Sequence, residues 1–132
     1  TTAHAKAVEN GVTNVGFACC DFNTMTGLRS CDWVVSCETM EHLLDPAAFA
    51  AKIRDAAGVG AVISIPIIPR TPTGRERAKQ GLTAHIQDIS AEGLDELFHP
   101  WKLVHEGRLD ERLPNGTIKK ELYKLAVYQP AE

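Results

Sequence analysis

The feature that most constrains this chain is an apolar strand-forming run that ends in a cluster of polar side chains. Residues 31–37 read CDWVVSC, which is rich in the β-branched and aromatic residues that favour strands. We predict a strand over residues 32–37, buried on both faces because it is so apolar. Glu38, Glu41 and His42 follow, and their spacing places them on one face of a helix. Polar residues just past the carboxyl end of a strand predict a ligand site, because open α/β sheets bind ligands there.

A helix and a further strand are predicted after this cluster. Asp45 is a typical helix cap, and the following Pro46 suits the first helical position. We expect Gly58 and Gly60 to end this helix. The run AVISIPII over residues 61–68 then predicts a nearly continuous apolar strand.

The remaining elements are predicted from the same local signals. Ala-rich and periodic segments favour helices, whereas β-branched runs favour strands and Pro-Asn-Gly favours a turn. The predicted elements are a helix over Thr2–Glu9, a strand over 14–19, a helix capped by Ser90, and strands over 101–106 and 121–128 that flank a turn region at 113–117. Alternating strands and helices with a closing antiparallel hairpin indicate a layered α/β sheet.

Composition limits the classes of protein to consider. A length of 132 residues favours a single domain over residues 1–132. The net charge of −3 gives no support to general nucleic-acid binding. No apolar run approaches the roughly 20 residues that cross a bilayer, and no secretory signal pattern is present. We therefore expect a cytoplasmic protein with no membrane association.

The cysteines do not form a recognisable framework. There are four, and none of their spacings gives a Cys-x-x-Cys pair. They are Cys19, Cys20, Cys31 and Cys37. We expect buried free thiols in a reducing cytoplasm, with a zinc site or a disulfide as the alternatives.

The order of these segments resembles the second half of a class I S-adenosylmethionine-dependent methyltransferase. The segments that carry the resemblance are FACCDF, CDWVVSCETMEHLLDPAAFAAKI, GVGAVISIPI and HIQDISAEGLDELF. Together they cover about residues 3–128. The resemblance implies a Rossmann-like sheet of parallel strands and helices with a C-terminal antiparallel hairpin.

This sheet is expected to be incomplete. The family's glycine-rich first loop, and the acidic residue that ends its second strand, are absent from the sequence. The resemblance thus implies a methyltransferase domain without its N-terminal cofactor-binding strands. The first residue is Thr and lies in a predicted helix, so we expect a trimmed N-terminus. A further N-terminal segment, or another chain in a homo-oligomer, is expected to fill the gap.

The resemblance also implies residues that bind S-adenosylmethionine. Asp21 and Phe22 match the position that meets the adenine, where a carboxylate accepts from an amine and a ring offers an apolar face. Ser36, Cys37 and Glu38 match the loop that passes beneath the cofactor, where the contact is mostly with the backbone. The alternative is that both segments are structural turns.

Glu38, Glu41 and His42, with His85 as a fourth ligand, form a candidate Mg²⁺ site. This arrangement resembles the ubiquinone-pathway O-methyltransferases and the small-RNA 3′-end 2′-O-methyltransferases. The resemblance implies a metal that binds substrate hydroxyls and lowers their pKa. In the alternatives, His42 or His85 acts as a general base without metal, or these residues have structural or substrate-shaping roles.

The segment over residues 69–83 is polar and basic and is predicted to be a loop. Its basic residues can either grip an anionic substrate or simply be solvated. They are Arg70, Arg75, Arg77 and Lys79.

The sequence as a whole predicts a methyltransferase that acts on oxygen or nitrogen of a small molecule. One alternative is a non-catalytic methyltransferase-like partner or scaffold module, which the missing glycine-rich loop favours. The other is an RNA 2′-O-methyltransferase, which the acidic charge balance argues against.

Overall fold

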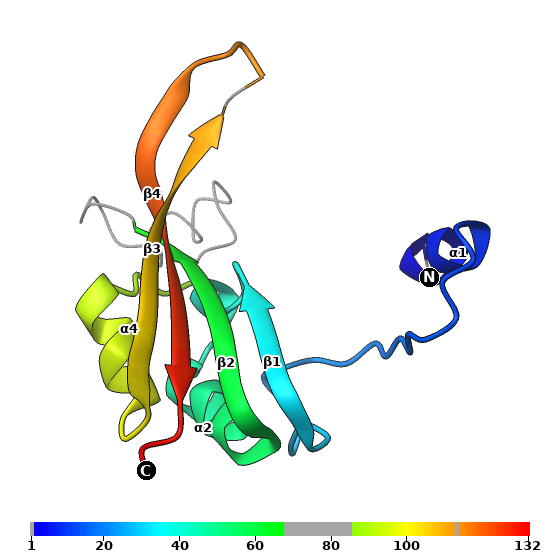
Figure 1. Ribbon diagram of the computed structural model, residues 1–132, viewed down its shortest axis with the longest axis horizontal. Helices are drawn as coiled ribbons and strands as arrows, with labels where there is room; N and C mark the ends of the chain where they lie inside the picture. The colour runs from blue at the N-terminus through cyan, green and yellow to red at the C-terminus, as the bar shows by residue number, and fades with distance from the viewer. Residues whose placement is uncertain (1, 68–85, 113) are drawn as a thin grey trace.

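The sheet has four strands in the order β1-β2-β4-β3 (Figure 1). The computed structural model describes residues 2–67, 86–112 and 114–132. The strands are β1 (Cys31–Cys37), β2 (Ala57–Pro66), β3 (Lys102–Arg112) and β4 (Ile118–Gln129). β1 is parallel to β2, whereas β4 is antiparallel to both β2 and β3. The predicted α/β sheet with a closing antiparallel hairpin is confirmed.

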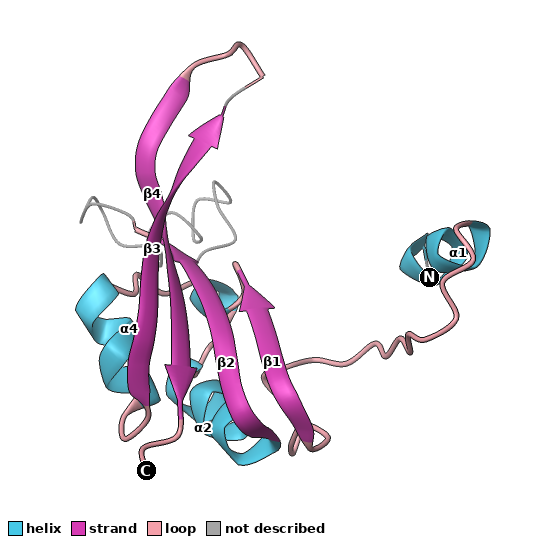
Figure 2. Ribbon diagram, in the orientation of Figure 1, coloured by secondary structure: helices cyan, strands magenta, loops and turns pink. Residues whose placement is uncertain are grey.

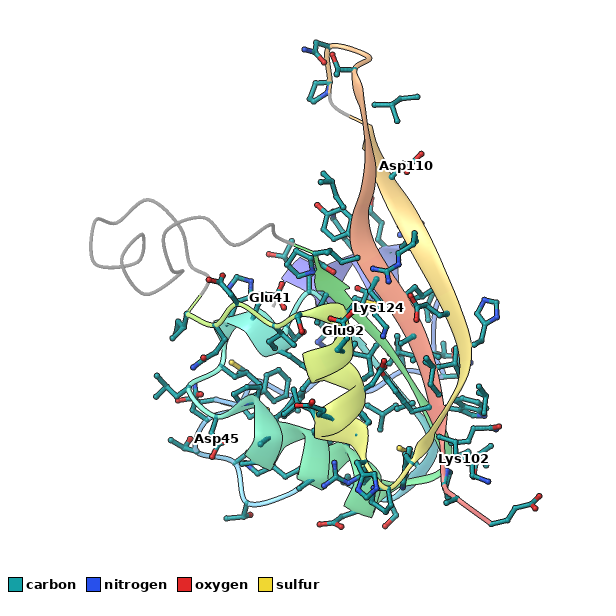
Figure 3. The ribbon with its side chains drawn as sticks, turned by 90° about the vertical axis from the view of Figure 1, so that its left-hand side faces the viewer. Glu41, Asp45, Glu92, Lys102, Asp110 and Lys124 are labelled. Atoms are coloured by element: carbon teal, nitrogen blue, oxygen red, sulfur yellow. The ribbon has the colours of Figure 1, made fainter. Side chains whose placement is uncertain are left out.

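Two helices lie together on one side of this sheet (Figures 2 and 3). The helices of the described chain are α1 (Thr2–Glu9), the one-turn 3₁₀ helix η1 (Met40–His42), α2 (Pro46–Ala56) and α4 (Ala91–Phe98). α2 and α4 both begin at their predicted caps. The Asp45 carboxylate accepts a hydrogen bond from the Ala48 N–H, and the Ser90 hydroxyl oxygen accepts one from the Gly93 N–H, each at 2.9 Å. Such a cap contributes about 1 kcal/mol.

None of the helices in the described ranges is long and apolar enough to cross a membrane.

The hydrophobic core lies between α2, α4 and the sheet. Ile63 and Ile65 of β2 are fully buried, as are Ile53 of α2 and Phe98 of α4. The Phe98 ring stacks on the ring of Tyr128 in β4, with 4.4 Å between their centroids. Burying a side chain of this size contributes about 1.5–3 kcal/mol. The core therefore fixes both helices against the two central strands.

A buried ammonium group joins α4 to the hairpin. The side chain of Lys124 is 1% exposed, and its Nζ donates to the Asp95 carboxylate at 2.8 Å and to the Ala91 carbonyl at 2.9 Å. Glu106 of β3 lies 3.4 Å from the same Nζ. Burial and a hydrogen bond to Asp95 raise the pKa of Tyr128 well above its ordinary value. These groups satisfy one another, so the charge is buried with its partners.

β1 is an edge strand, and the prediction that it is buried on both faces is wrong. Trp33 is 43% exposed and Val35 is 67% exposed. Successive side chains of a strand point to opposite faces, so Trp33 and Val35 lie on the face opposite to that of the buried Ser36. No described segment covers the face of β1 that carries Trp33. The apolar composition of the strand therefore does not by itself determine which of its side chains are buried.

The segment ahead of β1 forms no strand. Residues 14–19 have no strand assignment, and Phe17 is 45% exposed. α1 has its predicted bounds, yet it buries none of its residues and projects away from the sheet (Figure 1). The predicted strand over 14–19 is wrong because β-favouring residues form a strand only when a neighbour pairs with them.

The prediction of buried cysteines is also wrong. All four thiols are free and exposed. Cys19 and Cys20 lie on the unpaired segment, and Cys31 and Cys37 lie at the two ends of the edge strand β1.

β2 begins at Ala57, directly after α2, so Gly58 and Gly60 lie in the strand and do not terminate the helix. Gly60 is required by its neighbours. A Cβ atom there would lie 2.6 Å from Cζ3 of Trp33 and 2.7 Å from the Tyr128 carbonyl oxygen. The absence of a side chain at Gly60 therefore allows β1, β2 and β4 to approach at this point.

We predict that Gly60→Ala destabilises the fold by about 1–3 kcal/mol, because the added methyl group overpacks a site closed by backbone. Gly58→Ala is the matched control, since a Cβ there meets only the Cys31 carbonyl oxygen at 3.7 Å. Urea unfolding of both variants measures the difference. Equal stability of the two variants would contradict this packing.

Candidate functional site

The carboxyl ends of β1 and β2 lie side by side, with Cys37 paired to Ser64. The Glu38 N–H donates to the Ser64 carbonyl at 3.1 Å, and the Ser64 hydroxyl donates to Glu38 Oε1 at 2.8 Å. Glu38 has a left-handed φ of 49°. Such backbone conformations are uncommon for residues other than glycine and gather at functional sites. Glu38 therefore turns the chain at the strand end while its carboxylate is held on β2.

The two residues before Glu38 differ in burial. Ser36 is buried, and its hydroxyl has no hydrogen-bond partner among the described residues. Cys37 is exposed, and its carbonyl accepts from the Thr39 hydroxyl at 2.9 Å. The structure thus brings Ser36, Cys37 and Glu38 together at the carboxyl end of β1, and their contact with a cofactor stays a prediction.

Asp21 and Phe22 lie near the start of α2. Asp21 Oδ1 accepts from the backbone N–H of Asn23 at 2.9 Å and from its side-chain amide at 3.1 Å. The Asn23 side chain in turn accepts from the Leu44 N–H at 2.9 Å. The Phe22 ring packs against Phe49, with 5.1 Å between centroids. Both residues therefore have structural contacts in a turn, and their predicted adenine role stays a prediction.

Glu41 is the most unusual residue of the site. It is 1% exposed, and neither of its carboxylate oxygens has a hydrogen-bond partner in the described chain. Its backbone carbonyl accepts from the N–H groups of Ile86 and Gln87, at 2.8 and 3.0 Å. His42 is 37% exposed, and its Nε2 lies 3.6 Å from Glu41 Oε1. The sequence pattern indicated the pair but not the burial of the carboxylate.

Burial raises the pKa of Glu41 above its ordinary value of 4.5. Its backbone hydrogen bond lowers this pKa, the nearby charge of Glu38 raises it, and His42 lowers it. Desolvation is the largest cause, because a carboxylate that is buried loses its hydration.

A cavity of about 300 Å³ lies beside Glu41. In Figure 3, Glu41 is seen at the same end of the sheet as the start of α4. The described residues that line the cavity are Glu41, Pro46, Ile65, Pro66, Gln87, Asp88, Ile89, Ser90, Gly93 and Leu97. The cavity therefore combines acidic side chains with an apolar wall.

The helical face predicted for a metal site is not formed. η1 contains only Met40–His42, and the left-handed Glu38 lies outside it. Within residues 2–67, 86–112 and 114–132, no three His, Cys, Asp or Glu side chains are grouped to hold a metal ion. His85 lies outside the described residues, so the four-ligand site and the general-base roles stay predictions. The loop residues Arg70, Arg75, Arg77 and Lys79 also lie outside them.

Comparisons with known proteins identify the fold. No family profile and no curated protein matches the sequence. Among solved structures, TehB from Haemophilus influenzae matches with a TM-score of 0.70 and 14% identity, over 96% of this chain and 45% of that one. NodS, an N-methyltransferase from Bradyrhizobium japonicum WM9 solved with S-adenosyl-L-homocysteine, matches with a TM-score of 0.65 and 13% identity, over 99% and 62%. An S-adenosylmethionine-dependent methyltransferase from Mesorhizobium loti matches with a TM-score of 0.66 and 10% identity, over 98% and 77%.

This chain has part of the methyltransferase fold. The methyltransferase-like chain spans 45% and 62% of the first two solved structures, so it corresponds to only part of their length. Identities this low show the fold alone.

We predict that the free energy of unfolding of this methyltransferase-like chain falls less with rising pH after the substitution Glu41→Gln. The folded pKa of Glu41 is raised above 4.5, so above this pH the unfolded chain releases a proton that the folded chain retains. The free energy of unfolding therefore falls as pH rises from about 4.5 through the folded pKa. Glu41→Gln lacks this contribution.

The measurement is urea unfolding of the wild type, Glu41→Gln and the control Glu96→Gln, an exposed residue of α4, between pH 4 and 8. Glu41→Gln should gain stability over the wild type as pH rises, whereas Glu96→Gln should follow the wild type. Parallel pH curves for all three proteins would rule out a raised pKa at Glu41.

Proposed function

We propose that this chain is part of an S-adenosylmethionine-dependent methyltransferase that acts on oxygen or nitrogen of a small molecule. The observation that carries the proposal is the match of 96–99% of the chain to solved structures that include methyltransferases, one of them with S-adenosyl-L-homocysteine bound. The paired carboxyl ends of β1 and β2 support it, because ligands of open α/β sheets bind at this edge.

The residues at the crevice fit part of the cofactor. S-adenosylmethionine supplies an activated methyl group, so positioning of the acceptor can provide much of the rate. Ser36, Cys37 and Glu38 would hold the cofactor from below. The buried Ser36 hydroxyl has no hydrogen-bond partner among the described residues, so it could donate to the cofactor or accept from it. Asp21 and Phe22 would meet the adenine.

Proton removal from the acceptor is assigned to an imidazole. His42 is partly exposed beside the carboxylate of Glu41, which can stabilise the imidazolium after it takes a proton. His85 is the second candidate. In the alternative, His42 and His85 would hold Mg²⁺ together with Glu38 and Glu41. The metal would then lower the pKa of the acceptor.

A non-catalytic methyltransferase-like scaffold is the competing function. The sequence lacks a glycine-rich strand-to-helix loop ahead of β1, and such loops bind cofactor groups through their backbone N–H groups. An RNA substrate is less well supported, because the net charge is −3.

We predict micromolar binding of S-adenosylhomocysteine to the chain, measured by titration calorimetry. Asp21→Asn should weaken binding about tenfold, as expected for loss of one hydrogen bond. The amide oxygen can still accept from Asn23, so the turn is kept, whereas the new NH₂ group cannot accept from the adenine amine. Asp55→Asn, an exposed change on α2, is the control and should bind like the wild type.

The titration is repeated with Mg²⁺. Tighter binding with Mg²⁺ would support the metal site, and equal binding would favour an imidazole base. A folded chain that shows no binding under either condition would contradict cofactor binding by these 132 residues alone. It would leave the chain as an incomplete part of a methyltransferase or as a scaffold.

A further inference from the structure

The cavity beside Glu41 contains a buried carboxylate whose nearest described charged neighbour is His42, with Nε2 3.6 Å from Oε1. Glu41 is 1% exposed and lines the cavity, and both of its oxygens lack a hydrogen-bond donor. Leaving a buried polar group without a partner is costly, and such groups are rare in folded proteins. Some other interaction must therefore offset the cost of burying the Glu41 carboxylate.

The backbone holds Glu41 in this position. Its carbonyl accepts from both Ile86 and Gln87, which precede α4 in the chain. Met40, the residue before it, is fully buried in the core. The carboxylate is consequently presented by a fixed turn and is preorganised for a ligand, which reduces the entropy lost on binding.

The other polar groups of the cavity are already engaged. The Ser90 hydroxyl caps α4 by accepting from Gly93, and the Gln87 amide donates to the Leu44 carbonyl at 3.3 Å. Asp88 adds a second acidic side chain, and none of the described lining residues is Lys, Arg or His. The charge of the described lining is therefore negative.

We propose that this cavity binds a protonated amine whose ammonium group donates hydrogen bonds to Glu41. Hydrogen bonds between charged partners are about twice as strong as those between neutral ones. A cation inside the cavity also supplies the donors that both carboxylate oxygens lack. Of the described groups that face Glu41, only His42 can carry a positive charge, and the charge of Glu38 adds to the negative potential.

The remaining wall of the cavity selects the body of this amine. Ile65, Pro66 and Leu97 contribute apolar surface to the lining. A volume of about 300 Å³ lies at the small end of ligand sites, so the body is a small alkyl or aryl group. The ligand is therefore an ammonium group on a compact apolar frame.

This inference deepens the proposed function and rests on it for the fate of the amine. The amine would anchor the acceptor, or would itself be the acceptor once the imidazole base had taken its proton and freed the nitrogen lone pair. Binding of the amine needs no S-adenosylmethionine, so the two proposals can fail separately. If the wild-type chain binds the amine but does not bind S-adenosylhomocysteine, only the methyltransferase proposal loses support.

The test compares benzylamine with benzyl alcohol, which has nearly the same shape but no charge at pH 7. Binding to the full 132-residue chain is followed by the backbone amide NMR signals of Gln87, Ile89 and Gly93. We expect benzylamine to shift these signals with a dissociation constant at least about tenfold lower than that of benzyl alcohol. This comparison uses the wild type alone, so it does not depend on any variant folding.

Glu41→Gln keeps the size of the side chain and the backbone hydrogen bonds but removes the charge. It should abolish the preference for benzylamine, whereas Glu96→Gln, which removes an exposed charge outside the cavity lining, should retain it. Equal affinity of the wild type for the two compounds, absence of benzylamine binding, or an unchanged preference in Glu41→Gln would each overturn the proposal.

Discussion

The packing of α2 and α4 on the side chains of β2 is the interaction on which the rest of this structure depends. Ile63 and Ile65 are fully buried under these helices, and their strand is bonded to β1 on one side and β4 on the other. The same strand carries Ser64, which holds Glu38 by both its backbone and its hydroxyl. From Glu38 the chain turns into η1 and buries Glu41. The candidate site therefore follows from the core.

Local sequence signals predicted the elements that depend on local interactions. Asp45 and Ser90 cap α2 and α4 as expected, and the closing hairpin forms, with strands longer than predicted. Signals that depend on distant neighbours failed. Residues 14–19 favour a strand but have no strand to pair with. Gly60 was predicted to end a helix, but it lies in β2 with the Trp33 ring beside it. Tertiary contacts overrode propensity in both cases.

The candidate site was predicted only in outline. Spacing placed Glu38, Glu41 and His42 on one helical face, but the left-handed backbone at Glu38 separates it from η1. The burial of Glu41 could not be predicted from its local sequence, because the residues that bond its carbonyl, Ile86 and Gln87, are distant in the chain. The structure adds to the predicted cofactor residues an acidic cavity lined by Glu41 and Asp88. The proposed methyl donor and the proposed amine would occupy different places at this end of the sheet.

The most direct test of this account is to locate S-adenosylhomocysteine on the chain by backbone amide NMR. The account predicts that the largest signal changes occur at Ser36, Cys37 and Glu38, at the carboxyl end of β1, with further changes at Asp21. It also predicts small changes on β3, which lies at the opposite edge of the sheet from β1. Changes confined to α1 or to the hairpin, or no changes in a folded chain, would contradict the assignment of this crevice as the cofactor site.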